Sequence, residues 1–97
     1  MRPRQSPQAL GAVLHGVIDK LGLRRRLEET RAVETWAALA GPQINGVTAS
    51  VWVKGDTLYV RIISAAWRHQ LHLQRRAWRD RLNEELGTPA IREIVFR

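Results

Sequence analysis

The feature that most constrains this chain is an alternating pattern on both sides of a glycine turn. Apolar residues alternate with polar or aromatic ones over Ala49–Lys54, and the alternation resumes over Thr57–Ile63. Gly55-Asp56 between the two stretches suits a two-residue hairpin turn. Because successive strand residues point to opposite faces, the sequence predicts an antiparallel hairpin with one apolar face.

The turn also sets the expected register, with Lys54 opposite Thr57. Three apolar pairs then fall on the core face: Val53 with Leu58, Val51 with Val60, and Ala49 with Ile62. The other face carries Trp52 opposite Tyr59 and Ser50 opposite Arg61. Trp52, Tyr59 and Arg61 are therefore a candidate partner-binding surface. Stacking of unpaired bases and cover by the first helix are the alternatives.

Helical spacing and capping residues predict three helices and one further strand. Ser6-Pro7 suits a helix start, and Gly22, Gly41-Pro42 and Gly87 suit helix ends. The expected helices are 7–21, 24–40 and 64–86, and the expected last strand is 91–96. This ααββαβ order predicts an α+β single domain over residues 7–97, with a three-stranded sheet and helices packed on one face. Residues 1–6 are expected to form a flexible basic arm.

The charge balance indicates a polyanionic partner. Sixteen lysine and arginine residues stand against nine acidic ones, giving a net charge of +7, and lysine occurs only at positions 20 and 54. Arginine makes planar, bidentate contacts with phosphate groups. Solubility or a biased base composition of the gene would explain the same excess without a partner.

Basic side chains gather along one edge of the expected third helix. At about 100° per residue, Arg68, His72, Arg75 and Arg79 form a stripe with Arg76 at its margin. Like charges stacked in this way repel each other, so stability alone does not favour them. We expect this stripe to contact a phosphate backbone, the alternative being a solvated arginine face.

A second candidate nucleic-acid contact lies at the start of the expected second helix. Arg24, Arg25 and Arg26 would place three cations at the positive end of the helix dipole. Such a local conflict often marks a functional position. Trp36, Trp67 and Trp78, by contrast, lie on apolar helix faces and are expected to be core residues.

No pattern typical of catalysis occurs. The chain has no cysteine, no glycine-rich phosphate loop and no Ser-His-Asp grouping, so no enzyme activity or cofactor is expected. His69 and His72 have metal-binding spacing but lie among arginines, and no metal site is expected. There is neither a cleavable signal nor an apolar run long enough to span a membrane, which predicts a cytoplasmic protein.

A set of short motifs occurs in an order that resembles the DciA family of bacterial proteins. They are Leu21-Gly22-Leu23, Trp36, Ala40-Gly41, the hairpin segment Val53–Val60, Ser64 with Trp67 and Leu71, Arg81-Leu82-Asn83, Leu86-Gly87 and Ile94–Arg97. Each motif is short, and their order and spacing over nearly the whole chain carry the resemblance.

The resemblance implies a domain similar to the type II KH fold, which binds nucleic acid. It also implies a role as loader or operator of the replicative DNA helicase and no ATPase activity. We expect single-stranded or forked DNA as a partner and a place at the nucleoid. KH domains clamp nucleic acid through a Gly-x-x-Gly loop, and this chain lacks that spacing. We therefore expect the arginine stripe to make the contact. An RNA-binding KH-like module acting at the ribosome is the alternative.

Overall fold

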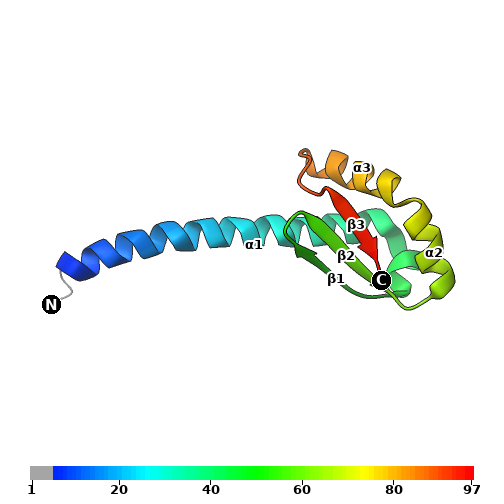
Figure 1. Ribbon diagram of the computed structural model, residues 1–97, viewed down its shortest axis with the longest axis horizontal. Coiled ribbons are helices and arrows are strands. Elements are labelled where there is room, and N and C mark those ends of the chain that lie inside the picture. The colour runs from blue at the N-terminus through cyan, green and yellow to red at the C-terminus, as the bar shows by residue number, and fades with distance from the viewer. Residues whose placement is uncertain (1–5) are drawn as a thin grey trace.

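The computed structural model describes residues 6–97, with side chains from residue 20 onward. Its elements are α1 (Ser6–Gly46), β1 (Thr48–Lys54), β2 (Thr57–Ile62), α2 (Ala65–Leu73), α3 (Arg75–Leu86) and β3 (Glu93–Phe96) (Figure 1). The predicted α+β class with a three-stranded sheet is confirmed, although the order is αββααβ. This architecture is compatible with a KH-like domain. The expected arm lies outside the described residues except for Ser6, which is already helical, and the division at residue 7 stays a prediction.

The sheet has the strand order β1-β2-β3, with β1 and β2 antiparallel and β2 and β3 parallel. Every predicted hairpin pair from the turn out to Ser50–Arg61 is confirmed. The outermost pair is wrong, because Ile62 pairs with Thr48 and a β-bulge lies between Thr48 and Ser50. The bulge leaves Ala49 as the extra residue, a local irregularity that alternation alone does not reveal.

The predicted helix end at Gly22 is wrong, and the predicted end at Gly41-Pro42 is confirmed. α1 runs through Gly22, which has no positive φ, whereas Gly41 adopts φ 81° and ψ 175° and interrupts the helix. Pro42 then begins a short helical stretch that ends at Gly46. A lone glycine costs a helix only about 1 kcal/mol relative to alanine, so good helix formers on both sides outweigh it.

The predicted helix over 64–86 is two helices. Ser64 caps the first by accepting a hydrogen bond from the backbone N–H of Trp67, and Gly87 caps the second in the left-handed conformation. Gln74, at φ −102° and ψ 12°, separates them. A straight helix over this stretch would be about 34 Å long. The bend folds α3 back along β3 and α1, while α2 closes the end of the sheet (Figure 1).

Trp36 of α1 stands at the centre of the core and is fully buried. Its ring centroid lies 5.2 Å from that of Trp78 on α3 and 5.6 Å from that of Phe96 on β3. Trp67 and Trp78 are partly buried against the core, as expected. The other fully buried large side chains come from β2, β3 and both short helices: Leu58, Val60, Ile62, Leu71, Leu82 and Ile94.

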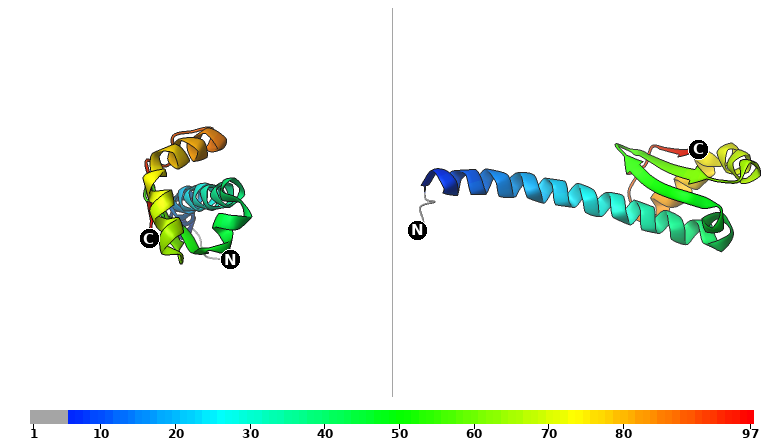
Figure 2. Two further views of the ribbon diagram at one scale, coloured as in Figure 1. Left: turned by 90° about the vertical axis from the view of Figure 1, so that its right-hand side faces the viewer. Right: turned by 90° about the horizontal axis from the view of Figure 1, so that it is seen from below.

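All helices pack on one face of the sheet, and the opposite face is left open (Figure 2). The amino-terminal part of α1 extends well beyond the sheet, which gives the molecule extents of 62 × 24 × 18 Å (Figure 2). Within residues 6–97, no helix is apolar enough over a sufficient length to cross a membrane.

Two glycines of α1 predict opposite responses to the same substitution. Gly41→Ala should lower the free energy of unfolding by about 1–3 kcal/mol, because its backbone conformation is nearly restricted to glycine. Gly22→Ala should raise it by about 0.5–1 kcal/mol, since a Cβ there meets nothing within 4 Å. Urea denaturation measures both changes. Destabilisation by Gly22→Ala would contradict the uninterrupted helix.

The side chain of Asn83 holds the segment that leads into β3, so its removal should lower the stability of the fold. Its side-chain amide donates to the Ile91 carbonyl at 2.6 Å, and its Oδ1 accepts from the Ile91 N–H at 3.0 Å. Asn83→Ala leaves both backbone groups without a partner and should lower the free energy of unfolding by about 1–3 kcal/mol. Thermal denaturation measures this change. The exposed neighbour Glu84 is the control, where Glu84→Ala should change stability by less than about 0.5 kcal/mol.

Candidate nucleic-acid interface

The predicted basic stripe does not form one line, because the helix that was to carry it bends at Gln74. Arg68 lies on α2 beside the end of β2, where its Nη1 donates to the Ile62 carbonyl at 3.0 Å. Arg75, Arg76 and Arg79 lie on α3, beyond the bend. The single stripe is therefore replaced by two separate cationic surfaces.

The first surface is a hollow of about 460 Å³ between α3 and the start of β3. Arg75, Arg76, Arg79, Arg92, Asp56, Glu93 and Ile94 line it, and we call it the arginine hollow. Four guanidinium groups there stand against two carboxylates. The hollow thus carries a net positive charge at a site open to solvent.

Hydrogen bonds fix two of these guanidinium groups. Arg75 Nη1 donates to the His72 carbonyl at 2.9 Å and lies 3.3 Å from His72 Nε2. Arg79 bonds to the Asp80 carboxylate at 2.9 Å and reaches the Arg92 carbonyl at 3.5 Å. His72 therefore positions Arg75 from the end of α2, and the pairing with Asp80 offsets part of the charge of Arg79.

Arg92 was not among the predicted site residues. It comes from the segment before β3, and its guanidinium lies 3.6 Å from the Asp56 carboxylate in the hairpin turn. The Arg92 N–H also donates to the Asp56 carbonyl at 2.8 Å. These contacts join segments far apart in the sequence, so no local pattern could have placed Arg92 beside α3.

The second surface is the open face of the sheet. Trp52 and Tyr59 stack with ring centroids 5.3 Å apart and planes 10° apart. The Arg97 guanidinium lies 4.7 Å from the Tyr59 ring centroid. Cover by the first helix is excluded, because the helices pack on the other face (Figure 2). The alternatives of a protein partner and of unpaired bases both remain compatible with an open face.

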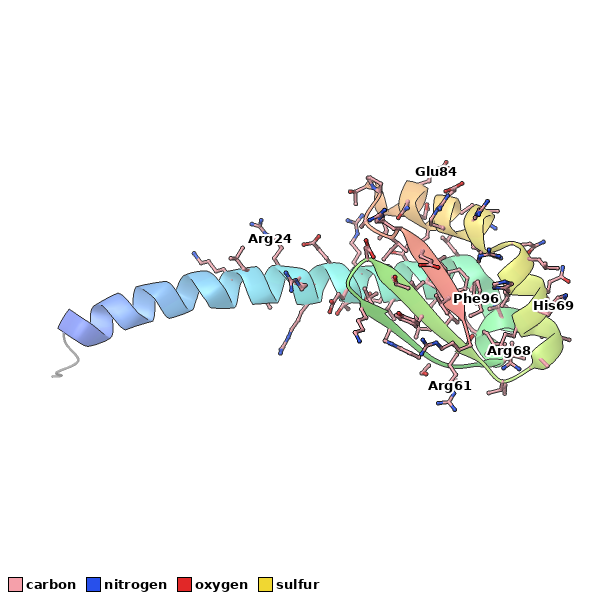
Figure 3. All side chains as sticks on the ribbon, viewed as in Figure 1. Arg24, Arg61, Arg68, His69, Glu84 and Phe96 are labelled. Atoms are coloured by element: carbon pink, nitrogen blue, oxygen red, sulfur yellow. The ribbon has the colours of Figure 1, made fainter. Side chains whose placement is uncertain are left out.

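Arg61 and Arg68 lie at the same end of this face (Figure 3). With Trp52, Ile62, Ile63 and Arg97 they line a second hollow of about 570 Å³. Arg97 was not predicted either. It follows β3 two residues after Val95, the partner of Tyr59, and so points to the same face of the sheet as Val95. Only the parallel pairing of β2 and β3 brings it onto this face.

Arg24 lies in the projecting part of α1 (Figure 3), and the side chains of Arg24, Arg25 and Arg26 are all exposed. They lie in the middle of a continuous helix and not at a helix start, so the predicted conflict with the dipole is wrong. Arg24 and Arg25 line a groove between α1 and the hairpin tip, together with Leu21, Glu28, Glu29, Ala32, Val53, Gly55, Ala90 and Ile91. The two glutamates offset the charge of the two arginines there.

Across the residues that the structure describes, no group of three or more histidine, cysteine or acidic side chains is arranged to hold a metal ion. The arginine hollow and the open sheet face present guanidinium groups and aromatic rings, which recognise phosphates and planar rings.

Comparison with known proteins gives one family. The family model described as Dna[CI] antecedent, DciA, matches residues 9–96, which is nearly the whole chain. No curated protein matches the chain in a sequence comparison. The matched family consists of accessory proteins of bacterial DNA replication that act in loading the replicative helicase. The chain belongs to the DciA family.

Proposed function

We propose that this protein binds single-stranded or forked DNA at the arginine hollow while the projecting part of α1 holds the replicative helicase. It acts in the cytoplasm at the nucleoid, with no cofactor, small-molecule substrate or reaction of its own. One observation carries the DNA half of the proposal: four arginines line one solvent-open hollow, against two acidic residues in its lining and Asp80, which pairs with Arg79.

The start of α3 favours a phosphate in this hollow. Arg75 and Arg76 begin the helix, and neither an acidic side chain nor a side-chain cap from Gln74 occupies its first turn. The unpaired N–H groups of that turn and the nearby guanidinium groups both favour an anion. A phosphate of the DNA backbone can accept from both kinds of donor.

The projecting part of α1 favours a protein partner. Ala32 and Trp36 pack on the domain, and the same arc of the helix continues past the hairpin tip. At about 100° per residue, four apolar positions fall within about 80° of Trp36. They are Leu10, Leu14, Ile18 and Leu21, which we call the α1 arc.

The exposed part of this arc argues for an additional protein surface. Leu21 is 60% exposed at the edge of the groove that α1 forms with the hairpin tip. A partner that lies along the arc would therefore continue the interface that α1 already makes with its own domain. Family membership supports the replicative helicase as this partner.

Removing charge from the arginine hollow should weaken DNA binding. Replacing Arg75 and Arg76 by glutamine should reduce affinity for an oligothymidine at least tenfold near 100 mM salt. It should also reduce the slope of log affinity against log salt by about 1.4, since each phosphate contact with a single strand contributes about 0.7. Fluorescence anisotropy over a salt series measures both quantities.

The matched control removes two exposed arginines that lie outside the hollow, Arg31 and Arg81, by the same replacement. Its salt slope should stay near that of the unchanged protein. An equal loss in both double variants would mean that overall charge, not the hollow, governs binding. Recovery of ribosomal RNA instead of helicase with the tagged protein would contradict the DNA assignment.

Substitutions on two sides of α1 test the helicase surface. Leu14→Ser with Leu21→Ser changes the α1 arc, whereas Leu23→Ser with Leu27→Ser changes the other side of the same helix. Only the first pair should weaken capture of the purified helicase, by at least tenfold, because each lost leucine contact is worth about 1.5–3 kcal/mol.

Helicase capture is measured with and without DNA, and the mass of the free protein is measured by light scattering. Loss of capture with the second pair alone would contradict the arc. A fall in mass from dimer to monomer with the first pair, at unchanged capture, would identify the arc as a contact between two copies of the chain.

A further inference from the structure

The aromatic rings of the open sheet face form part of a column that crosses all three strands. Trp52 lies on β1, Tyr59 on the central strand β2, and Arg97 directly after β3. Because β2 lies between the other two strands, the phenol ring lies between the indole and the guanidinium group. The column thus runs from a cation through two rings and ends on the indole of Trp52.

The free end of this column lies at an edge of the sheet. β1 is an edge strand, so no further strand flanks Trp52 on its outer side. Among the described residues, the stacking and cation contacts of Trp52 include Tyr59 alone. The partly buried indole of Trp52 therefore ends the column, and a planar group is the shape that would extend it on its outer side.

The positive charge beside the column favours a planar group that carries a negative charge. Arg61, Arg68 and Arg97 line the hollow next to Trp52, and no carboxylate side chain contributes to its lining. The Arg68 guanidinium donates one hydrogen bond to the Ile62 carbonyl, and this bond holds Arg68 beside the hollow. Planar rings joined by a phosphate backbone match an indole face bordered by guanidinium groups.

We propose that the open sheet face binds unpaired bases of single-stranded DNA, with one base stacked on Trp52 and an adjoining phosphate on Arg61. The inference rests on the proposed DNA binding and explains how the protein would select unpaired over duplex DNA. A base inside a duplex is stacked on both sides and has no free face, so this site accepts only unpaired strands. The proposed ligand of Trp52, Tyr59 and Arg61 is thus DNA, in place of the protein partner that we expected from the sequence.

The test compares three ligands of one length: an oligothymidine, an abasic oligomer with the same phosphodiester backbone, and a blunt duplex. Trp52→Ala should weaken binding of the oligothymidine roughly 5- to 150-fold, the range for one stacked base. It should leave the abasic oligomer, the duplex and the salt slope unchanged, because no phosphate contact is lost. Trp52→Phe keeps a ring and should restore most of the affinity.

Arg61→Gln is the matched variant for the phosphates. It should weaken the oligothymidine and the abasic oligomer alike and lower the salt slope by about 0.7. Thermal melting confirms that each variant is folded, and the side chain of Arg61 is exposed, so its replacement leaves the core intact.

Three outcomes would overturn the inference. Trp52→Ala could leave oligothymidine binding unchanged, it could weaken all three ligands equally, or it could abolish capture of the helicase while DNA binding persists. If the unchanged protein binds the oligothymidine and the abasic oligomer equally, base stacking on Trp52 is contradicted. The proposed phosphate binding at the arginine hollow is not affected by that result. If it binds none of the three ligands, the proposed DNA binding fails as well.

Discussion

The burial of Trp36 is the contact on which the rest of this structure depends. It joins α1 to α3 through Trp78 and to the sheet through Phe96, and these elements lie far apart in the sequence. A buried tryptophan removes a large apolar surface from water, and two edge or tilted ring contacts add about 0.5–1.5 kcal/mol each. This exceeds the cost of its indole N–H, which has no hydrogen-bond partner among the residues that the structure describes.

Fixing α1 at Trp36 has two consequences for function. The helices occupy one face of the sheet, so the face that carries Trp52 is left to solvent. α1 also continues far beyond the last residue that it packs on the domain, which exposes Leu21. The open sheet face and the projecting helix are thus both results of where one tryptophan is buried.

Local patterns predicted those parts of the fold that local chemistry decides. The Gly55-Asp56 turn set the hairpin register out to Ser50, and Ser64 and Gly87 marked helix ends that the structure confirms. Gly22 and Gly41 show the limit of such reasoning. Both follow an apolar helix face, yet only Gly41, which precedes a proline, breaks the helix, because a lone glycine among good helix formers costs too little to end one.

The candidate site was harder to predict, because tertiary contacts assemble it. Arg75, Arg76 and Arg79 were identified from their spacing, but Gln74 gave no sign that the helix bends and separates them from Arg68. Arg92 and Arg97 reach the two cationic surfaces only through the pairing of β3 with β2. A parallel strand pair has no connecting turn to set its register, so sequence spacing cannot place the residues at its ends.

Arg92 and Arg97 also relate the two proposed DNA contacts to each other. Arg92 precedes β3 and lines the arginine hollow, and Arg97 follows β3 and lines the hollow beside Trp52. At about 3.3 Å per residue they lie about 16 Å apart along one edge strand. By strand parity Arg92 shares the core side of the sheet with Ile94, whereas Arg97 shares the open face with Val95. The stacking face of Trp52 lies farther away, at the opposite edge of the sheet on β1. The two proposed contacts therefore take different stretches of DNA, one on each side of the sheet, and the projecting part of α1 stays free for a protein partner.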